Sequence, residues 1–280
     1  MSGSKKPFST FRLLSFDIYG TLIEWEKGII DALSPIRARL PDSSPLKTDD
    51  LALASLFVKH ELRLQSTNPG RTYDKILRDA YISVATELLP PPSSSSPENK
   101  ESVPNAETLQ SEGVALAESI AIWPPFPDTI DAMRKLKRLG FILVPVSNVD
   151  RDSFGKTLAG PLAGLSSRLS GSAPFFDAVY TAQDIGSYKP DLRNFEYLIS
   201  HAESQFGVQK HQILHVAQSL THDHVPAKQI GLESVWIARG KDGVSGIGGD
   251  VEALEGRTAF AWRFKDLGEF ADAVEAELQK

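Results

Sequence analysis

Four short segments of the chain carry residues that could do chemistry, and Asp17 belongs to the first. The run Leu13-Leu14-Ser15-Phe16 is short and apolar enough for a buried strand, and Asp17 follows it just before a Gly20-Thr21 turn. Open α/β sheets bind ligands at the carboxyl ends of their strands, and an aspartate there can attack to form a covalent acyl intermediate. Asp17 is therefore a candidate nucleophile. The alternative is an aspartate that forms a turn or caps a helix.

Three further segments place polar residues at or just after expected strand ends. They are Ser147-Asn148, Lys189-Pro190, and Gln218-Ser219 running on to Asp223. Each taken singly has a plain structural explanation: a helix cap at 147 or 148, a solvated surface lysine at 189, or a charge at a helix N-terminus at 223. In a parallel sheet, however, all four segments converge on one edge. Their order and placement favour a functional site.

The elements that must position these segments alternate between strands and helices. Strands are expected at 141–148, 178–181, 213–217, 234–238 and 259–264, and helices at 128–139, 191–204 and 226–230. This alternation predicts a doubly wound, Rossmann-like parallel sheet of the α/β class. The glycines of 240–250 lack the G-x-G-x-x-G spacing between a strand and a helix, which excludes a dinucleotide site there.

A long stretch after the first strand has only helical patterns. Helices are expected at 23–40, 51–64, 73–89 and 107–121, with no good strand between Leu22 and Trp123. We therefore expect an α/β core formed by 1–23 and 123–280, interrupted by an all-helical domain over 24–122. The Pro/Ser-rich segment 90–105 within it is expected to be a flexible loop.

Composition narrows the possible partners. Of the 280 residues, 41% are hydrophobic and 24% charged, and the net charge is −6, so no basic surface for nucleic acid is expected. The absence of cysteine excludes disulfides, thiolate catalysis and Cys-based metal sites. A short polar N-terminus and the lack of a long apolar run predict no membrane partner and a cytoplasmic location. The sequence leaves a homodimer open.

The order of the four segments resembles the haloacid dehalogenase superfamily. Its motifs are matched by Asp-x-Tyr-Gly-Thr, then Ser-Asn, then Lys-Pro, then Ser-x-x-x-Asp. The stretch 17–22 and Ser147-Asn148 resemble the type II (L-2-haloacid) dehalogenase branch in particular. The resemblance covers the α/β core, and the helical insertion falls where that family carries its cap.

The resemblance implies a hydrolase with an aspartate nucleophile and a small carboxylate substrate. Asp17 would displace halide from C2 of a 2-halocarboxylic acid, and water would hydrolyse the resulting ester to a 2-hydroxy acid. Lys189 would pair with Asp17 and keep it ionised and aimed, while Asp223 would orient Lys189 or the water. Thr21, Ser147 and backbone N–H groups would hold the oxyanion or the substrate carboxylate.

The remaining residues at the motif positions are expected to bind substrate. Asn148 would donate to the departing halide, assisted by a cap residue, either Lys59 or Arg63. The rest of the expected substrate-binding set is Ile18, Tyr19, Gln218 and Ser219. The chain departs from the well-known dehalogenases at Phe195, where they carry Tyr, and at Gln218 and Leu220, where they carry Ser and Asn.

Two residues distinguish the expected chemistry from that of the superfamily's phosphatases. Those enzymes typically carry Asp two residues after the nucleophile and an acid in the fourth motif, where this chain has Tyr19 and Gln218. Mg²⁺ prefers anionic oxygen ligands, whereas a departing halide needs neither a metal nor a proton. We therefore expect no cofactor and no metal site. The alternatives are a phosphatase with an altered Mg²⁺ site and a catalytically silent relative that binds a small anion or a protein.

Three histidines near the fourth motif raise the question of zinc. His222 and His224 flank Asp223, but neighbours one and two residues apart cannot share a helix face, so we expect local hydrogen bonding instead. His215 lies in an apolar strand and is expected to be a satisfied core residue.

Overall fold

A computed structural model describes residues 5–89, 104–165, 174–240, 249 and 252–280. The chain divides into two compact units, one formed by Met1–Glu24 with Pro124–Lys280 and the other by Trp25–Trp123. Most of the expected loop at 90–105, and most of the glycine-rich stretch 240–250, lie outside the described residues.

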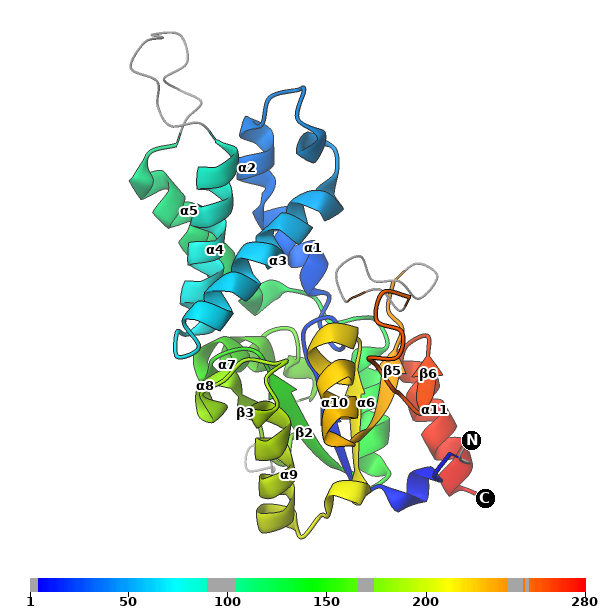
Figure 1. Cartoon of the computed structure of the whole chain (residues 1–280). Coiled ribbons are helices and arrows are strands. Elements are labelled where there is room, and N and C mark those ends of the chain that lie inside the picture. Colours follow the sequence, from blue (N-terminus) through cyan, green and yellow to red (C-terminus); the bar gives the residue numbers. More distant parts are fainter. Residues whose placement is uncertain (1–4, 90–103, 166–173, 241–248, 250–251) are drawn as a thin grey trace, which may run out of the picture. The chain divides into compact units, whose positions relative to one another are not determined.

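The first unit contains a six-stranded, all-parallel sheet, counted over the described residues, in the order β3-β2-β1-β4-β5-β6 (Figure 1). The strands are β1 (Leu13–Phe16), β2 (Ile142–Ser147), β3 (Tyr180–Thr181), β4 (Ile213–Ala217), β5 (Glu233–Ile237) and β6 (Trp262–Phe264). The helices are α6 (Thr129–Arg138), α7 (Arg151–Ala159), α8 (Ala182–Ile185), α9 (Arg193–Phe206), α10 (Val225–Ile230) and α11 (Leu267–Leu278). The predicted parallel α/β fold with an inserted all-helical domain is confirmed.

Strand β3 is shorter than the expected strand at 178–181. It begins at Tyr180 and ends at Thr181 as expected, where the Thr181 hydroxyl accepts from the Asp184 backbone N–H and the Asp184 carboxylate accepts from the Thr181 backbone. This capping box turns the chain into α8 directly after two paired residues.

Strand β1 lies at the point where the order of the sheet reverses. It pairs with β2 on one side and with β4 on the other. Such a switch point opens a crevice beyond the carboxyl ends of the strands. Asp17 comes directly after β1, so the fold places it at that crevice.

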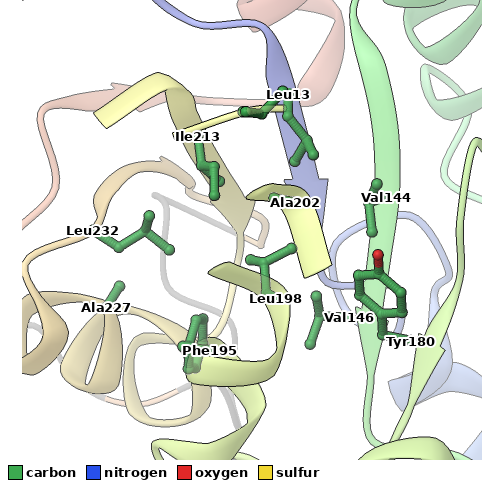
Figure 2. Packing of buried hydrophobic residues seen from close by; sticks show 11 residues of the cluster. Leu13, Val144, Val146, Tyr180, Phe195, Leu198, Ala202, Ile213, Ala227 and Leu232 are labelled. Atoms are coloured by element: carbon green, nitrogen blue, oxygen red, sulfur yellow. The ribbon is translucent and has the colours of Figure 1, made fainter. Parts of the chain in front are cut away.

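Helices α9 and α10 pack over one face of the sheet through a dry apolar layer. Figure 2 shows Leu13 and Ile213 from the strands and Phe195 and Leu198 from α9 in one cluster, to which Ala227 of α10 also belongs. Successive side chains of a strand point to opposite faces, so Ser15 and His215, two residues further along β1 and β4, face the same helices as Leu13 and Ile213. The parallel register pairs these two polar residues directly.

In the described residues of the second unit, all the regular secondary structure is helical. Its helices are α1 (Trp25–Ala32), α2 (Ser34–Arg39), α3 (Asp50–Thr67), α4 (Tyr73–Leu88) and α5 (Ala106–Ser119). The prediction of a single helix at 23–40 is wrong, because this segment forms two helices separated by a break at Leu33. Pro35 explains the break, since proline has no N–H for the preceding turn and is tolerated only in the first turn of a helix.

None of the described helices is both long and apolar enough to cross a membrane.

A carboxyl group lies inside the helical unit. Glu61 of α3 is 8% exposed, accepts a hydrogen bond from Gln65 Nε2 at 3.0 Å, and is also hydrogen-bonded to Tyr73. Burial raises the pKa of the Glu61 carboxyl to about 7, although the bonds from Tyr73 and Gln65 act in the opposite direction. The folded protein therefore holds a proton on Glu61 that the unfolded chain gives up at lower pH.

Replacing Glu61 with Gln should stabilise the protein at alkaline pH and have little effect at pH 5. The unfolded carboxyl titrates near 4.5 and the folded one near 7, so wild-type stability falls as pH rises through that window. Gln has no proton to lose. The free energy of unfolding of Glu61→Gln should exceed that of the wild type by up to about 3 kcal/mol at pH 8.

Urea unfolding at pH 5 and pH 8 measures this difference. The matched control is Glu118→Gln, an exposed glutamate of α5 in the same unit, which should show no such pH dependence. An equal effect of Glu61→Gln at both pH values would contradict the prediction.

Candidate active site

The ammonium of Lys189 joins two carboxylates at the carboxyl edge of the sheet. Its Nζ donates to Asp17 Oδ1 at 2.8 Å and to Asp223 Oδ1 at 2.7 Å. Asp17 is 7% exposed, Lys189 2% and Asp223 0%, so this cluster is almost dry. The tertiary structure thus brings together three residues that sequence reasoning placed at three separate strand ends.

Opposite charges outweigh burial within this cluster. Burial alone would lower the pKa of Lys189, but the charges of Asp17 and Asp223 raise that pKa above its ordinary value. Burial alone would raise the pKa of Asp223, but the charge of Lys189 and a hydrogen bond from His215 hold it well below its usual range. Lys189 and Asp223 are therefore both ionised near neutral pH.

Thr21 fixes the second oxygen of Asp17. Its hydroxyl donates to Asp17 Oδ2 at 2.7 Å and accepts from the Gln218 backbone N–H at 2.9 Å. Each carboxylate oxygen of Asp17 thus has one donor, and the two donors come from different loops. This arrangement orients the carboxylate at the end of β1.

Arg239, which sequence reasoning missed, holds the backbone of the same loop. Its Nε and Nη2 donate to the Thr21 carbonyl at 3.2 and 2.9 Å, and its Nη1 donates to Asp128 at 2.6 Å. The guanidinium also stacks over Phe126, 4.0 Å from the ring centroid. A lone arginine at the end of an expected strand carries no sequence signal for this role, because its partners are more than a hundred residues away.

Asn148 holds the backbone of Lys189. Its Nδ2 donates to the Lys189 carbonyl at 3.0 Å, and its Oδ1 accepts from the Lys189 N–H at 2.7 Å. The expected role of Asn148 as a donor to halide stays a prediction. The structure adds a positional role, which is to aim Lys189 toward the cluster.

The other expected site residues lie around this edge with varied contacts. Ser147 ends β2 fully buried, and no described residue hydrogen-bonds its hydroxyl. The Tyr19 hydroxyl bonds the Thr157 hydroxyl at 2.6 Å, and burial raises the pKa of Tyr19, which keeps the phenol neutral. The Ile18 side chain is fully buried, and the Ser219 hydroxyl accepts from the His222 backbone N–H at 3.1 Å.

His215 is satisfied in the core, as expected, but its partner belongs to the ion cluster. Its Nε2 lies 2.9 Å from Asp223 Oδ1 and its Nδ1 lies 2.8 Å from Ser15 Oγ. Sequence reasoning missed the link to Asp223. The available signal was one polar residue in each of two apolar strands, because buried polar groups need partners.

Local hydrogen bonds engage the histidines that flank Asp223. His222 contacts Ser219, while His224 Nδ1 contacts Ser234 Oγ at 2.9 Å and its Nε2 contacts the Ala217 carbonyl at 3.0 Å. Within the described ranges, no three His, Cys, Asp or Glu residues are arranged to hold a metal ion.

The donors around Asp17 do not suit Mg²⁺. Both Asp17 oxygens already accept hydrogen bonds, one from an ammonium whose charge would repel a divalent cation. Tyr19 and Gln218, at the positions where metal-dependent relatives carry acids, are neutral. Mg²⁺ is bound through carboxylates and waters in octahedral geometry, and the second carboxylate of this cluster, Asp223, is itself paired with Lys189.

A carboxylate–ammonium–carboxylate cluster at the switch point of a parallel sheet lies where open α/β sheets bind their ligands. The model of the haloacid dehalogenase-like hydrolase family matches residues 11–231. The chain belongs to this family, which confirms the resemblance seen in the sequence.

Similar proteins within the family include both phosphatases and dehalogenases. A glyceraldehyde 3-phosphate phosphatase of Methanocaldococcus jannaschii is 30% identical over 123 residues, which cover 44% of this chain and 48% of the relative. An (S)-2-haloacid dehalogenase of Pseudomonas putida is 30% identical over 115 residues, covering 41% and 44%. The chain thus spans about half the length of the curated relatives that it matches.

Solved structures share the fold over almost the whole chain. The L-2-haloacid dehalogenase of Xanthobacter autotrophicus has a TM-score of 0.66 at 19% identity and covers 95% of this chain and 98% of its own. The likeness at this identity establishes the fold.

Removing the ammonium of Lys189 should destabilise the protein. Lys189→Met would leave two carboxylates in a buried site without their counter-charge, at a cost of about 3 to 5 kcal/mol in the free energy of unfolding. The double variant Lys189→Met/Asp223→Asn should recover part of that loss, because one buried charge is gone.

Urea unfolding at pH 7 measures both variants. Lys210→Met, at an exposed lysine, is the control and should change stability by less than about 0.5 kcal/mol. A double variant no more stable than Lys189→Met would contradict the charge-based explanation.

Proposed function

We propose that this protein is a metal-independent hydrolase in which Asp17 is the nucleophile, and that it converts a small 2-halocarboxylic acid to a 2-hydroxy acid. The observation that carries the proposal is the orientation of the Asp17 carboxylate at the switch point of the sheet, with Lys189 on one oxygen and Thr21 on the other. The similarity to an (S)-2-haloacid dehalogenase supports the choice of substrate class.

The reaction proceeds in two displacements. An Asp17 oxygen attacks C2 of the substrate, a C–O bond forms, and the C–halogen bond breaks with its electron pair leaving on the halide. Water then attacks the carbonyl carbon of the aspartyl ester. The 2-hydroxy acid departs with an original aspartate oxygen, and one proton is released to solvent.

The residues around Asp17 favour both steps. The Lys189 ammonium polarises the ester carbonyl, and the Thr21 hydroxyl and nearby backbone N–H groups can hold the oxyanion that forms when water adds. Asp223 has a pKa well below its usual range, so it is a poor base and serves to orient the water and Lys189. Ser147 has a buried hydroxyl that no described residue bonds, which supports assigning it to the substrate carboxylate.

Phosphate-ester hydrolysis is the second candidate, supported by the similarity to a glyceraldehyde 3-phosphate phosphatase. An alkoxide leaving group needs a proton, and burial raises the pKa of Tyr19, so this phenol, whose hydroxyl is bonded to Thr157, is a weak acid. Halide leaves as a stable anion without a proton. The residues at positions 19 and 218 therefore favour carbon–halogen cleavage.

A single turnover in H₂¹⁸O distinguishes a covalent mechanism from direct attack by water. The heavy oxygen should appear in the Asp17 carboxylate, because water attacks the ester carbonyl and the product takes an original aspartate oxygen. Mass spectrometry of the Asp17 peptide measures it. Asp17→Asn should lose about a thousandfold or more in rate. Label found only in the product would make Asp17 a general base.

Turnover should survive chelation of metals. We expect activity on L-2-chloropropionate with EDTA to equal that with Mg²⁺, and no activity on p-nitrophenyl phosphate in either condition. Gln218→Asp adds a carboxylate at the fourth motif and should increase Mg²⁺ binding, measured by calorimetry. Phosphatase activity that EDTA abolishes and Mg²⁺ restores would replace the dehalogenase proposal by the phosphatase one.

A further inference from the structure

Two polar side chains interrupt the apolar interior directly beneath the ion cluster. Ser15 of β1 and His215 of β4 are both fully buried and are paired neighbours in the parallel register. They lie on the face of the sheet that α9 covers, between the apolar layer of Leu13 and Ile213 and the site at the carboxyl edge. The ring of Phe195 in α9 meets the His215 imidazole edge to face, with centroids 5.1 Å apart.

The hydrogen bonds assign the proton on His215. Asp223 is ionised and can only accept, so His215 Nε2 carries the hydrogen and donates to Asp223 Oδ1. The other ring nitrogen, Nδ1, lies 2.8 Å from the Ser15 hydroxyl. A continuous series of hydrogen bonds therefore joins Ser15, His215 and Asp223.

Ser15, His215 and Asp223 do not form a serine hydrolase triad. Its serine, histidine and aspartate are each 0% exposed, so no substrate carbonyl can reach the Ser15 hydroxyl. Ser15 also lies within a paired strand, whereas a nucleophile must lie where substrate can approach. Asp223, the last member of this hydrogen-bonded series, is instead the partner of Lys189.

We propose that His215, supported by Ser15, is a positioning residue that holds Asp223 so that Lys189 is shared with Asp17. The effect of His215 on turnover rests on the proposed function. Its effect on the position of Asp223 follows from the hydrogen bonds of the cluster alone.

Competition for one ammonium is the reason that the cluster needs His215. Asp223 Oδ1 accepts from both Lys189 and His215, while no described residue hydrogen-bonds its buried Oδ2. A fully buried carboxylate that lost the His215 donor would rely on Lys189 alone. It would then draw the ammonium away from Asp17, whose own oxygen lies 2.8 Å from Nζ.

The charged and titratable groups that act on Asp223 come from three segments. Lys189 approaches from the loop before α9 and His215 from β4, while Asp17 lies across the ammonium at the end of β1. Within the segment of Asp223 itself, His222 and His224 adjoin it in sequence, His222 bonding Ser219 and His224 bonding Ser234 and the Ala217 carbonyl. Of these groups, His215 and Lys189 hydrogen-bond Asp223 directly, so the two donors can be tested separately.

Two variants of His215 test its two hydrogen bonds separately. The amide nitrogen of Gln can take the place of Nε2 and still donate to Asp223, whereas Asn is shorter and reaches only the position of Nδ1, near Ser15. We expect His215→Gln to keep kcat within about threefold and His215→Asn to lower kcat by about thirtyfold or more, with KM little changed in both. A merely space-filling role would make the two variants alike.

A second readout does not depend on turnover. In protein labelled with ¹³C at aspartate carboxyl groups, the Asp223 resonance is assigned by its loss in Asp223→Asn and followed against pH. Its titration midpoint should rise in His215→Asn and stay near the wild-type value in His215→Gln. This measurement separates the two proposals: if no haloacid is turned over, the proposed function fails, while the midpoint still tests His215.

Ser15→Ala keeps the inference testable if His215→Asn does not fold. It removes the hydrogen-bond partner of Nδ1, leaves His215 in place, and should move the Asp223 midpoint in the same direction by a smaller amount. Unchanged midpoints in all folded variants, or equal losses of kcat in His215→Gln and His215→Asn, would overturn the proposal.

Discussion

One ammonium shared between two buried carboxylates is the interaction on which the site depends. Lys189 holds Asp17 and Asp223 at 2.8 and 2.7 Å in a place almost without solvent. Taking such charges out of water is costly, and only close pairing with further hydrogen bonds offsets that cost. The surrounding structure supplies those bonds: Thr21 serves Asp17, and His215 serves Asp223.

The same constraint explains why side chains from distant segments hydrogen-bond the backbone of the loops that form the site. A misplaced ammonium would leave one carboxylate unpaired, so the backbone that carries Lys189 must be held, and Asn148 bonds it at both its N–H and its carbonyl. The turn after Asp17 is held by Arg239 through the Thr21 carbonyl. These contacts preorganise the carboxylate before any substrate binds, which is how a site lowers the cost of reorganisation during reaction.

Membership of the haloacid dehalogenase-like hydrolase family sets the general chemistry, and a few neutral residues bias its outcome. Tyr19 and Gln218 bring no negative charge to Asp17, and the nearest counter-charge is the ammonium of Lys189. We propose that a site balanced in this way suits a leaving group that departs as an anion better than it suits a divalent metal, because the metal and the ammonium would compete for the same carboxylate oxygens.

The sequence by itself determined the parallel α/β class, the inserted helical domain and the residues that form the ion cluster. These follow from local patterns: apolar runs of strand length, helical periodicity, and polar residues directly after strands such as β1. The break at Pro35 shows where a single residue overrode the periodicity.

Only the tertiary structure decided which other polar residues support the ion cluster. The pairing of Ser15 with His215 depends on the register between β1 and β4, which lie about two hundred positions apart in the chain. The clamp of Arg239 on the loop after Asp17 likewise joins distant segments. Local sequence carries periodicity, but contacts between remote strands are set by how the whole sheet assembles. For that reason the three residues of the ion cluster could be named in advance, while the supporting contacts of Ser15, His215 and Arg239 could not.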